Sequence, residues 1–376
     1  MKFLKVFISV VLIIALFFVV INLIPPKQAV EDNPFISTIG RPLIAAHRGG
    51  KDLSPENTLL AYDNALNRYH MEIVETDSYL TKDNVLVINH DSSINRTTDV
   101  MIRDDIELDK IDDIYYYKGE IYNGAYDMYN GKAYKRVLVE DKTLEELKAY
   151  NFGFRFESLA VAEGFEQQYP VGVRAFEYIT HIADEAERKA KIVEEKVGVL
   201  TVDELFEYFH LSAPDLLYIV EIKNSGERGK IAADILSNLL TNTYPTLKNK
   251  VSLCTFHPEI EDYLKEKYPT ILRGASTKGA TMFVLTTMLG VNLFENSGFA
   301  CLQIPIQEKI PGTNMKLNLV KKIYIKRAQR KNIAAQYWTI NDEEMMRKLI
   351  EFNVDCIMTD CPDLLYKVLK DMNKIE

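Results

Sequence analysis

The sequence predicts an α/β protein, a TIM-type (β/α)8 barrel with an insertion at its rim and one N-terminal transmembrane helix before it. From Pro42 onward, short apolar runs alternate with amphipathic helical patterns, which is typical of βαβ units and a parallel sheet. The chain has 376 residues, 47% of them hydrophobic, which is long enough for such a barrel as one domain. A long apolar run without charges predicts the membrane helix.

The N-terminal run covers residues 6–24 and contains no charged side chain. At about 1.5 Å per residue, a helix of this length matches a hydrocarbon core of about 30 Å. A cleavable signal peptide is the alternative, but the run exceeds a usual h-region, and Pro25-Pro26 follows it where an A-x-A-like site would stand. We therefore expect residues 1–24 to form an uncleaved anchor.

The charges around this run predict its orientation. Lys2 and Lys5 precede it, and Glu31 and Asp32 follow it. The positive-inside rule then places the N-terminus inside and the following domain on the extracytoplasmic side of a single-pass protein, although Lys27 opposes this assignment. Residues 25–41 are rich in proline and are expected to form a short tether.

Residues 42–376 are expected to form the barrel. Eight short apolar runs are its candidate strands, at residues 43–46, 73–76, 85–89, 217–222, 251–255, 301–304, 334–339 and 356–358. Eight strands of this kind favour a closed barrel over an open sheet.

One region, at about residues 100–196, departs from this rhythm. It contains many tyrosines and then a charged stretch, and it reads as an insertion on the barrel rim. A rim elaboration with its own small core is the favoured interpretation, because tyrosines also serve as half-buried packing residues. A lid or a substrate-recruiting surface near the membrane is the alternative.

Charge and cysteine usage exclude several function classes. A net charge of -9 and a pI near 5.4 argue against a nucleic-acid partner, which requires clustered Lys and Arg. The four cysteines show neither CxxC spacing nor a dense framework, which argues against a zinc site or a disulfide scaffold. We expect Cys254, Cys301, Cys356 and Cys361 to be buried free thiols.

Polar residues recur where the first candidate strands end, and catalytic side chains of such barrels lie at that face. His47 and Arg48 follow the first strand, and His90 follows the third. The second strand leads into Glu75 and Asp77, and the fourth carries Glu221 and Lys223. Because strand residues two apart share a face, each of these last two pairs points the same way.

Three carboxylates at one barrel mouth resist joint ionisation unless a cation neutralises them. Oxygen ligation by Glu75, Asp77 and Glu221 suits one divalent cation, Mg²⁺ or Ca²⁺, rather than zinc. Such an ion binds a phosphate oxygen and stabilises the charge that develops there. Arg48 and Lys223 are candidates for the remaining phosphate oxygens.

Hydrolysis of a phosphodiester near neutral pH also needs a proton acceptor and a proton donor. Histidine suits both roles because its ordinary pKa is about 6.5. His47 and His90 are the candidate pair. The other histidines lack a comparable position at a strand end, and these are His70, His181, His210 and His257.

Several motifs together resemble the glycerophosphodiester phosphodiesterase family, a TIM-barrel family of the phospholipase C-like phosphodiesterase superfamily. The motifs are HRG from His47, SPENT from Ser54, ETD from Glu75, TKDNVLVINHD from Thr81, VEIK from Val220, SLCTFHPE from Ser252, YWTIND from Tyr337 and CIMTDCPDLL from Cys356. They agree with the family pattern in order and spacing, and the resemblance covers most of residues 42–370. Two positions depart from it, because the family more commonly has ELD for ETD and a DG turn for Asp83-Asn84.

The resemblance implies a phosphoric diester hydrolase that converts glycerol-based phosphodiesters to sn-glycerol 3-phosphate and an alcohol. It implies metal ligation by Glu75, Asp77 and Glu221, acid/base roles for His47 and His90, phosphate contacts from Arg48 and Lys223, and a substrate pocket lined by Trp338. Water and the neighbouring glycerol hydroxyl both remain possible nucleophiles. The motifs specify no oligomeric state.

Two other functions compete with this reading. A lysophospholipase D-like enzyme would remove the headgroup from a lysophospholipid in the membrane, which the anchor favours by proximity. A catalytically silent, membrane-tethered binding module is the third candidate, since fold does not fix function. The presence of both histidines and all three carboxylates disfavours it.

Overall fold

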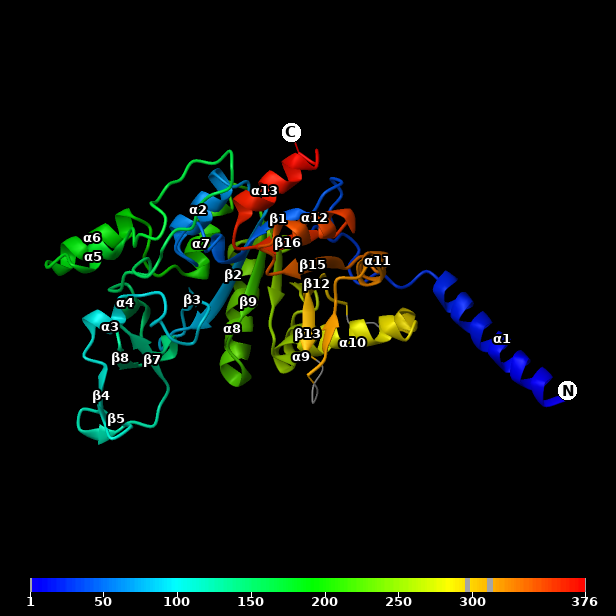
Figure 1. The fold of residues 1–376 in the computed structure, drawn as a ribbon, viewed down its shortest axis with the longest axis horizontal. Coiled ribbons are helices and arrows are strands. Elements are labelled where there is room, and N and C mark those ends of the chain that lie inside the picture. The colour runs from blue at the N-terminus through cyan, green and yellow to red at the C-terminus, as the bar shows by residue number, and fades with distance from the viewer. Residues whose placement is uncertain (1, 295–297, 310–313, 376) are drawn as a thin grey trace.

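The barrel is the centre of the molecule. In this computed structural model, which describes residues 2–294, 298–309 and 314–375, eight parallel strands follow the order β11-β10-β9-β2-β1-β16-β15-β12. Their bounds are β1 Leu43–Ala46, β2 Ile73–Leu80, β9 Leu217–Ile222, β10 Val251–Cys254, β11 Leu272–Arg273, β12 Cys301–Pro305, β15 Ala334–Trp338 and β16 Cys356–Thr359. A parallel bridge between Gly274 and Cys301 joins the two end strands. The predicted TIM-type barrel is therefore confirmed as a nearly closed sheet (Figure 1).

One predicted barrel strand is wrong, and one was missed. Residues 85–89 contain β3 (Leu86–Ile88), which pairs antiparallel with the end of β2 instead of joining the barrel. The chain reverses at Asn84, which has a positive φ of 59°. Asn tolerates this conformation better than most residues do. The remaining barrel strand is β11, whose two residues are too few to give a visible apolar run.

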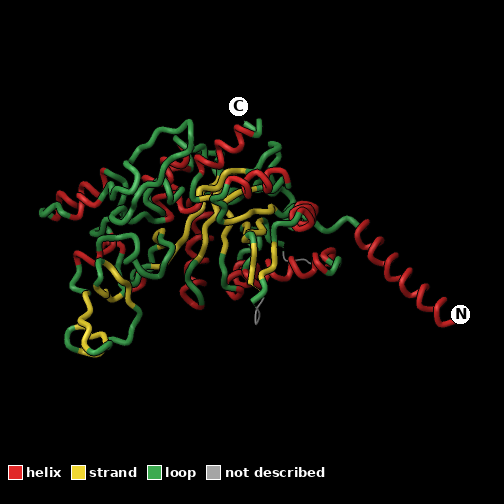
Figure 2. Tube along the Cα trace, viewed as in Figure 1, coloured by secondary structure: helices red, strands yellow, loops and turns green. Residues whose placement is uncertain are grey.

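Helices surround the strands, as Figure 2 shows. Those that pack around the barrel are α2 Leu59–Asn67, α7 Val202–Phe209, α8 Gly226–Asn238, α9 Pro258–Lys267, α10 Thr277–Met288, α11 Lys322–Arg330, α12 Glu343–Glu351 and α13 Pro362–Asp371. Local sequence sets where they begin. Thr201 and Glu204 form a capping box at α7, and the Asp342 side chain accepts from the Met345 amide at α12.

The N-terminal helix α1 (Lys2–Leu23) projects away from the barrel in Figure 1. Its segment Phe3–Leu23 is long and apolar enough to cross a membrane, with a mean hydropathy of 3.1, and little of it is buried. A signal sequence meets the same criteria.

Residues 25–41 pack against the barrel. Phe35 is fully buried in the apolar cluster that also contains Ala45 and Cys356. The Asn33 side-chain amide donates to the carbonyl oxygens of Ala300 and Asn332, at 2.8 Å each. This segment therefore closes the end of the barrel at which the strands begin.

The region at about residues 100–196 contains a small antiparallel sheet with strand order β6-β5-β4-β8-β7. Its elements are α3 Val100–Arg103, β4 Glu107–Ile111, β5 Ile114–Tyr117, β6 Glu120–Ile121, β7 Tyr126–Tyr129, β8 Lys132–Lys135, α4 Leu144–Leu147, α5 Glu177–Thr180 and α6 Glu185–Glu194. Tyr129, Tyr134 and Phe154 belong to its own apolar cluster. The sheet lies on the side of the barrel opposite to α1 (Figure 1). A separate hairpin, β13 (Gln307–Lys309) with β14 (Lys316–Asn318), follows β12.

Candidate active site

A cavity of about 130 Å³ lies where the barrel strands end. All eight side chains singled out from the sequence line it, and they are His47, Arg48, Glu75, Asp77, His90, Glu221, Lys223 and Trp338. They come from β2, from the ends of β1, β9 and β15, and from the loop after β3. The structure thus brings together residues that lie up to 291 positions apart in the chain, between His47 and Trp338.

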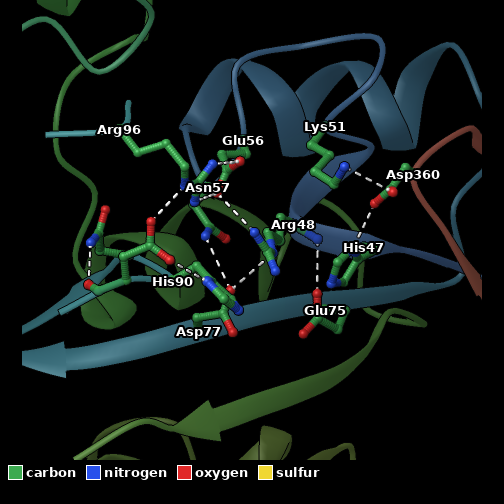
Figure 3. A network of polar contacts seen from close by, with 12 residues as sticks. His47, Arg48, Lys51, Glu56, Asn57, Glu75, Asp77, His90, Arg96 and Asp360 are labelled. Carbon is green, nitrogen blue, oxygen red and sulfur yellow. Dashed lines mark hydrogen bonds and ion pairs between the residues drawn. The ribbon is translucent and has the colours of Figure 1, made fainter. Parts of the chain in front are cut away.

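His47 begins a short 3-10 helix, η1 (His47–Gly49), directly after β1. Its Nδ1 lies 2.5 Å from Oδ1 of Asp360, a buried carboxylate after β16 (Figure 3). Asn341 and Lys51 hold the other Asp360 oxygen at 2.7 and 3.0 Å. Burial lowers the pKa of His47, but the negative charge of Glu75 and the bond to Asp360 outweigh it and raise that pKa overall.

The three predicted metal-binding carboxylates come from two neighbouring strands. Glu75 and Asp77 share one face of β2, and the β2–β9 register places Asp77 opposite Glu221. Burial raises the pKa of Glu75 to about 7, with a second contribution from the charge of Asp77. Burial and Asp77 likewise raise the pKa of Glu221. The positive side chains of the site therefore do not fully neutralise its three carboxylates.

Arg48 and Lys223 supply the nearest positive charges. The backbone amide of Arg48 donates to Glu75 at 2.8 Å, and its Nε lies 3.6 Å from Asp77. Nζ of Lys223 lies 2.9 Å from Glu221 and 3.6 Å from Asp77. Burial raises the pKa of Asp77, but Lys223 and Arg48 outweigh that effect and lower it overall.

The donor chemistry of these carboxylates fits a hard divalent cation, since all three face one cavity, Glu75 and Asp77 are buried there, and the neighbouring positive charges do not fully neutralise them. Within the described ranges, no three His, Cys, Asp or Glu side chains already form a metal-binding group. The Lys223 ammonium instead bonds Glu221 and lies beside Asp77. A cation at this position thus requires Lys223 to turn away from the carboxylates.

His90 faces the same cavity from the loop after β3. Its Nδ1 lies 2.7 Å from Asp91, whose other oxygen lies 2.5 Å from Nε of Arg96. Arg96 in turn bonds Glu56 at 2.6 Å, and Glu56 lies 3.2 Å from Arg48. A chain of hydrogen bonds and ion pairs thus links His90 to Arg48 (Figure 3).

Trp338 ends β15 and forms part of an aromatic wall with Phe256. The two rings make an edge-to-face contact with centroids 5.7 Å apart. Nζ of Lys223 lies 5.8 Å from the centre of the Phe256 ring. This aromatic side of the cavity suits the carbon atoms of a substrate.

Sequence reasoning missed the residues that hold the site in place. Asp360, Asp91, Glu56 and Arg96 orient or neutralise the predicted site residues, and Asn57 donates to Asp77 at 3.2 Å. A signal existed for Asp360, which follows the last residue of a barrel strand, and for Asp91, next to His90. Glu56 and Arg96 lie in loops whose pairing the sequence pattern does not indicate.

Comparisons with known proteins agree with this fold. A model of the glycerophosphoryl diester phosphodiesterase family matches residues 47–364. A glycerophosphodiester phosphodiesterase of Bacillus subtilis is 22% identical over 368 residues, covering 95% of this chain and 98% of that protein. A family domain from Mycobacterium tuberculosis shares the fold with a TM-score of 0.58 at 13% identity, covering 87% of this chain and 98% of the other.

A further solved structure is that of an Oleispira antarctica phosphodiesterase in complex with the product sn-glycerol-3-phosphate. It matches with a TM-score of 0.54 at 19% identity, covering 88% of this chain and 97% of the other. The family match confirms both the resemblance drawn from the motifs and the predicted class of enzyme, a phosphoric diester hydrolase. Because that match takes in most of the barrel, the chain belongs to the glycerophosphoryl diester phosphodiesterase family.

Proposed function

We propose that this protein hydrolyses glycerol-based phosphodiesters to sn-glycerol 3-phosphate and an alcohol, in a metal-dependent reaction with two histidines as acid and base. One observation carries the proposal: His47 and His90, each bonded to a carboxylate through Nδ1, line one cavity with the buried carboxylates of Glu75 and Asp77 and the half-buried carboxylate of Glu221. The names of the family and of the Bacillus relative, and the product held by the Oleispira enzyme, support the substrate class.

Glu75, Asp77 and Glu221 would hold the cation, Mg²⁺ or Ca²⁺. When bound, it neutralises these carboxylates and stabilises the charge on the phosphate oxygens during displacement. Lys223 and Arg48, released in part from the carboxylates, then donate to the remaining phosphate oxygens. Trp338 and Phe256 contact the carbon atoms of the substrate.

The two histidines take different roles because of where they lie. The Nδ1–H of His47 donates to Asp360, which leaves its Nε2 to accept a proton from the nucleophile. His47 is only 9% exposed, whereas His90 also borders a second, larger cavity. His90 is therefore assigned to protonate the departing alcohol, which leaves toward that opening.

The nucleophile is water or the glycerol hydroxyl beside the phosphate, and the second route passes through a cyclic phosphate. A substrate series with and without that hydroxyl decides between them. Equal turnover with both substrates identifies water as the nucleophile, and loss of turnover without the hydroxyl identifies the cyclic route.

The chain arrangement is part of the proposal. Residues 1–24 anchor the protein in a membrane, residues 25–41 connect the anchor to the barrel, and residues 42–376 form the catalytic domain on the extracytoplasmic side. The length and composition of α1 support this arrangement. The same helix favours the second candidate, lysophospholipase D-like removal of a headgroup from a membrane lysophospholipid.

A direct assay tests the proposal and separates the two candidates. The full chain in detergent is supplied with Mg²⁺ or Ca²⁺ and either glycerophosphocholine or lysophosphatidylcholine, and choline release is measured. We expect faster turnover of glycerophosphocholine, because the larger cavity beside the active site is lined largely by polar side chains. Preference for the lipid would favour the second candidate, and no turnover of any phosphodiester would favour a silent binding module.

A further inference from the structure

A second cavity of about 810 Å³ opens beside the active site, between the loop after β3 and the inserted region. His90 and Lys223 line both cavities, so the two spaces meet at the proposed proton donor. Residues of the insertion, among them Asp127, Arg136 and Arg155, form the opposite wall. A substrate with its phosphate in the first cavity thus extends its leaving alcohol into the second.

This second cavity carries an excess of positive charge. Four Arg and Lys side chains line it against two Asp side chains, in a chain whose net charge is -9. Arg96 is neutralised by Asp91 and Glu56, and Arg136 lies 3.0 Å from Asp127. Lys223 bonds carboxylates of the first cavity. The remaining cation is Arg155.

Arg155 makes no hydrogen bond and no ion pair with any residue that the structure describes. Its guanidinium stacks over the ring of Tyr129, 4.7 Å from the ring centre. It also lines a third cavity, of about 350 Å³, together with Arg174 and Arg96. Burial and the charge of Arg174 lower the pKa of Arg155, although Tyr129, Asp127 and Glu157 oppose that effect. A cation placed among other cations is suited to binding an anion.

We propose that Arg155 and Arg136 form a subsite for an anionic group carried by the leaving alcohol, a phosphate or a carboxylate. This inference rests on the proposed phosphodiesterase function and narrows its substrate class. The guanidinium of Arg155 lies over the Tyr129 ring, and its planar fork of N–H groups can bind two oxygens of one anion. Arg136 lines the same cavity and donates from Nε and one terminal nitrogen to Asp127, so its role in the subsite is secondary to that of Arg155.

The competing explanation is structural, because Arg155 could serve only to pack Tyr129 within the insertion. Removing a packing residue changes the rates of all substrates together through misplacement of the cavity wall. Removing an anion contact changes the ratio of rates between anionic and neutral substrates. The test therefore measures that ratio.

Three substrates that share one reacting end serve as probes. They are glycerophosphoglycerol, the same molecule with a terminal phosphate, and glycerophosphoglycerate, so that the leaving alcohol is neutral, phosphorylated or carboxylated. The full-length wild type should show higher kcat/KM for at least one anionic substrate than for the neutral one. In Arg155→Gln, that ratio should fall about tenfold or more, as expected for loss of a charge-assisted contact.

Arg155→Lys restores the charge without the bidentate geometry and should recover part of the ratio. Arg68→Gln is the matched control, because Arg68 directly follows α2, lines none of these cavities and has Glu166 at 3.9 Å as its ion-pair partner. It should change neither the rates nor the ratio. If all three substrates are turned over and Arg155→Gln leaves the ratio of kcat/KM between anionic and neutral substrates unchanged, the subsite alone is overturned. If the wild type turns over none of the probes, the proposed function is overturned as well.

Discussion

Asp360 is the residue on which the orientation of His47 depends. It accepts from His47 Nδ1, Asn341 and Lys51, and although burial raises its pKa, these contacts lower the pKa to about 2. The carboxylate therefore remains charged at every pH at which the enzyme would work. A charged partner fixes the ring tautomer of His47 and keeps Nε2 directed at the cavity.

The first prediction concerns the reaction rate of Asp360→Asn. An amide in place of the carboxylate removes the charge and favours the wrong tautomer of His47, so we expect kcat to fall by about a hundredfold or more with a smaller change in KM. Steady-state kinetics on glycerophosphoglycerol measure this. An unchanged kcat would show that His47 takes no part in proton transfer.

The same pair predicts a pH dependence of stability in the metal-free protein. The lowered pKa of Asp360 means that its contribution is present above its unfolded pKa of about 4 and is lost as the pH falls toward 2. The raised pKa of His47 means that its contribution is present below about 6.5 and is lost as the pH rises through the folded value. The pair is thus most stabilising between about pH 4 and 6.5.

Urea unfolding in EDTA, with wild type and Asp360→Asn compared across this range, measures the effect. We expect a difference in unfolding free energy of about 2 kcal/mol in that window, shrinking on either side of it. A difference that is constant with pH would contradict the assigned pair.

At the scale of elements, the turn after β1 determines where His47 and Arg48 lie. Arg48 has a positive φ of 53°, and Gly49 follows with a φ of 81° against the start of α2. A Cβ at Gly49 would lie 2.6 Å from Cβ of Ala61. The close approach of η1 to α2 therefore requires glycine at this position.

The corresponding prediction compares two glycine substitutions. Gly49→Ala combines backbone strain with a steric clash and should cost about 3 kcal/mol, with loss of activity as His47 moves. Gly40 has a similar φ of 75° and nothing near its would-be Cβ, so Gly40→Ala should cost about 1 kcal/mol and leave activity unchanged. Urea unfolding measures both, and equal costs would show that the contact with Ala61 is unimportant.

The elements also show what the sequence can predict. The strand pattern predicts that Glu75 and Asp77 share one face of β2 and that Glu221 faces the same interior from β9. This works because successive side chains of a strand point to alternate faces. The role of β3 was wrong, since an apolar run gives no information about its partner or direction. β11 was missed because a strand of two residues is too short to show an apolar pattern in the sequence. Its strand conformation depends on pairing with β10.

The candidate site divides in the same way. The residues that line the cavity lie at strand ends and belong to local motifs, so their positions were predictable. The contacts of Asp360 with His47 and of Arg96 with Glu56 span 313 and 40 positions, and both depend on how separate loops meet. Such pairings are set by tertiary structure. Thr76 and Asn84, the two departures from the family pattern, take part in neither of these two contacts.

At the scale of the whole molecule, residues 25–41 tie the N-terminal helix to the barrel. Phe35 fills the end of the barrel, and Asn33 links the segment to the loops before β12 and β15. Removal of this segment would leave a cavity lined by apolar strands.

Two truncations and one substitution test this arrangement. The chain from residue 25 onward should be soluble and active, whereas full-length protein should sediment with membranes if α1 is an uncleaved anchor. In the shorter chain, Phe35→Ala should lower the unfolding free energy by about 3 kcal/mol or more. A chain that begins at residue 42 should aggregate, and normal folding of that chain would contradict a structural role for the segment.

We propose that carboxylates of β2 and β9 surround a single cation and that hydrolysis depends on this ion. The most direct measurement is turnover of glycerophosphoglycerol by EDTA-treated full-length protein, before and after addition of Mg²⁺ or Ca²⁺, in wild type and Glu221→Gln. We predict that chelation abolishes wild-type activity, that at least one of these ions restores it, and that Glu221→Gln recovers no more than about a hundredth of the restored rate. Full activity after chelation, in wild type and in His47→Ala alike, would contradict the claim.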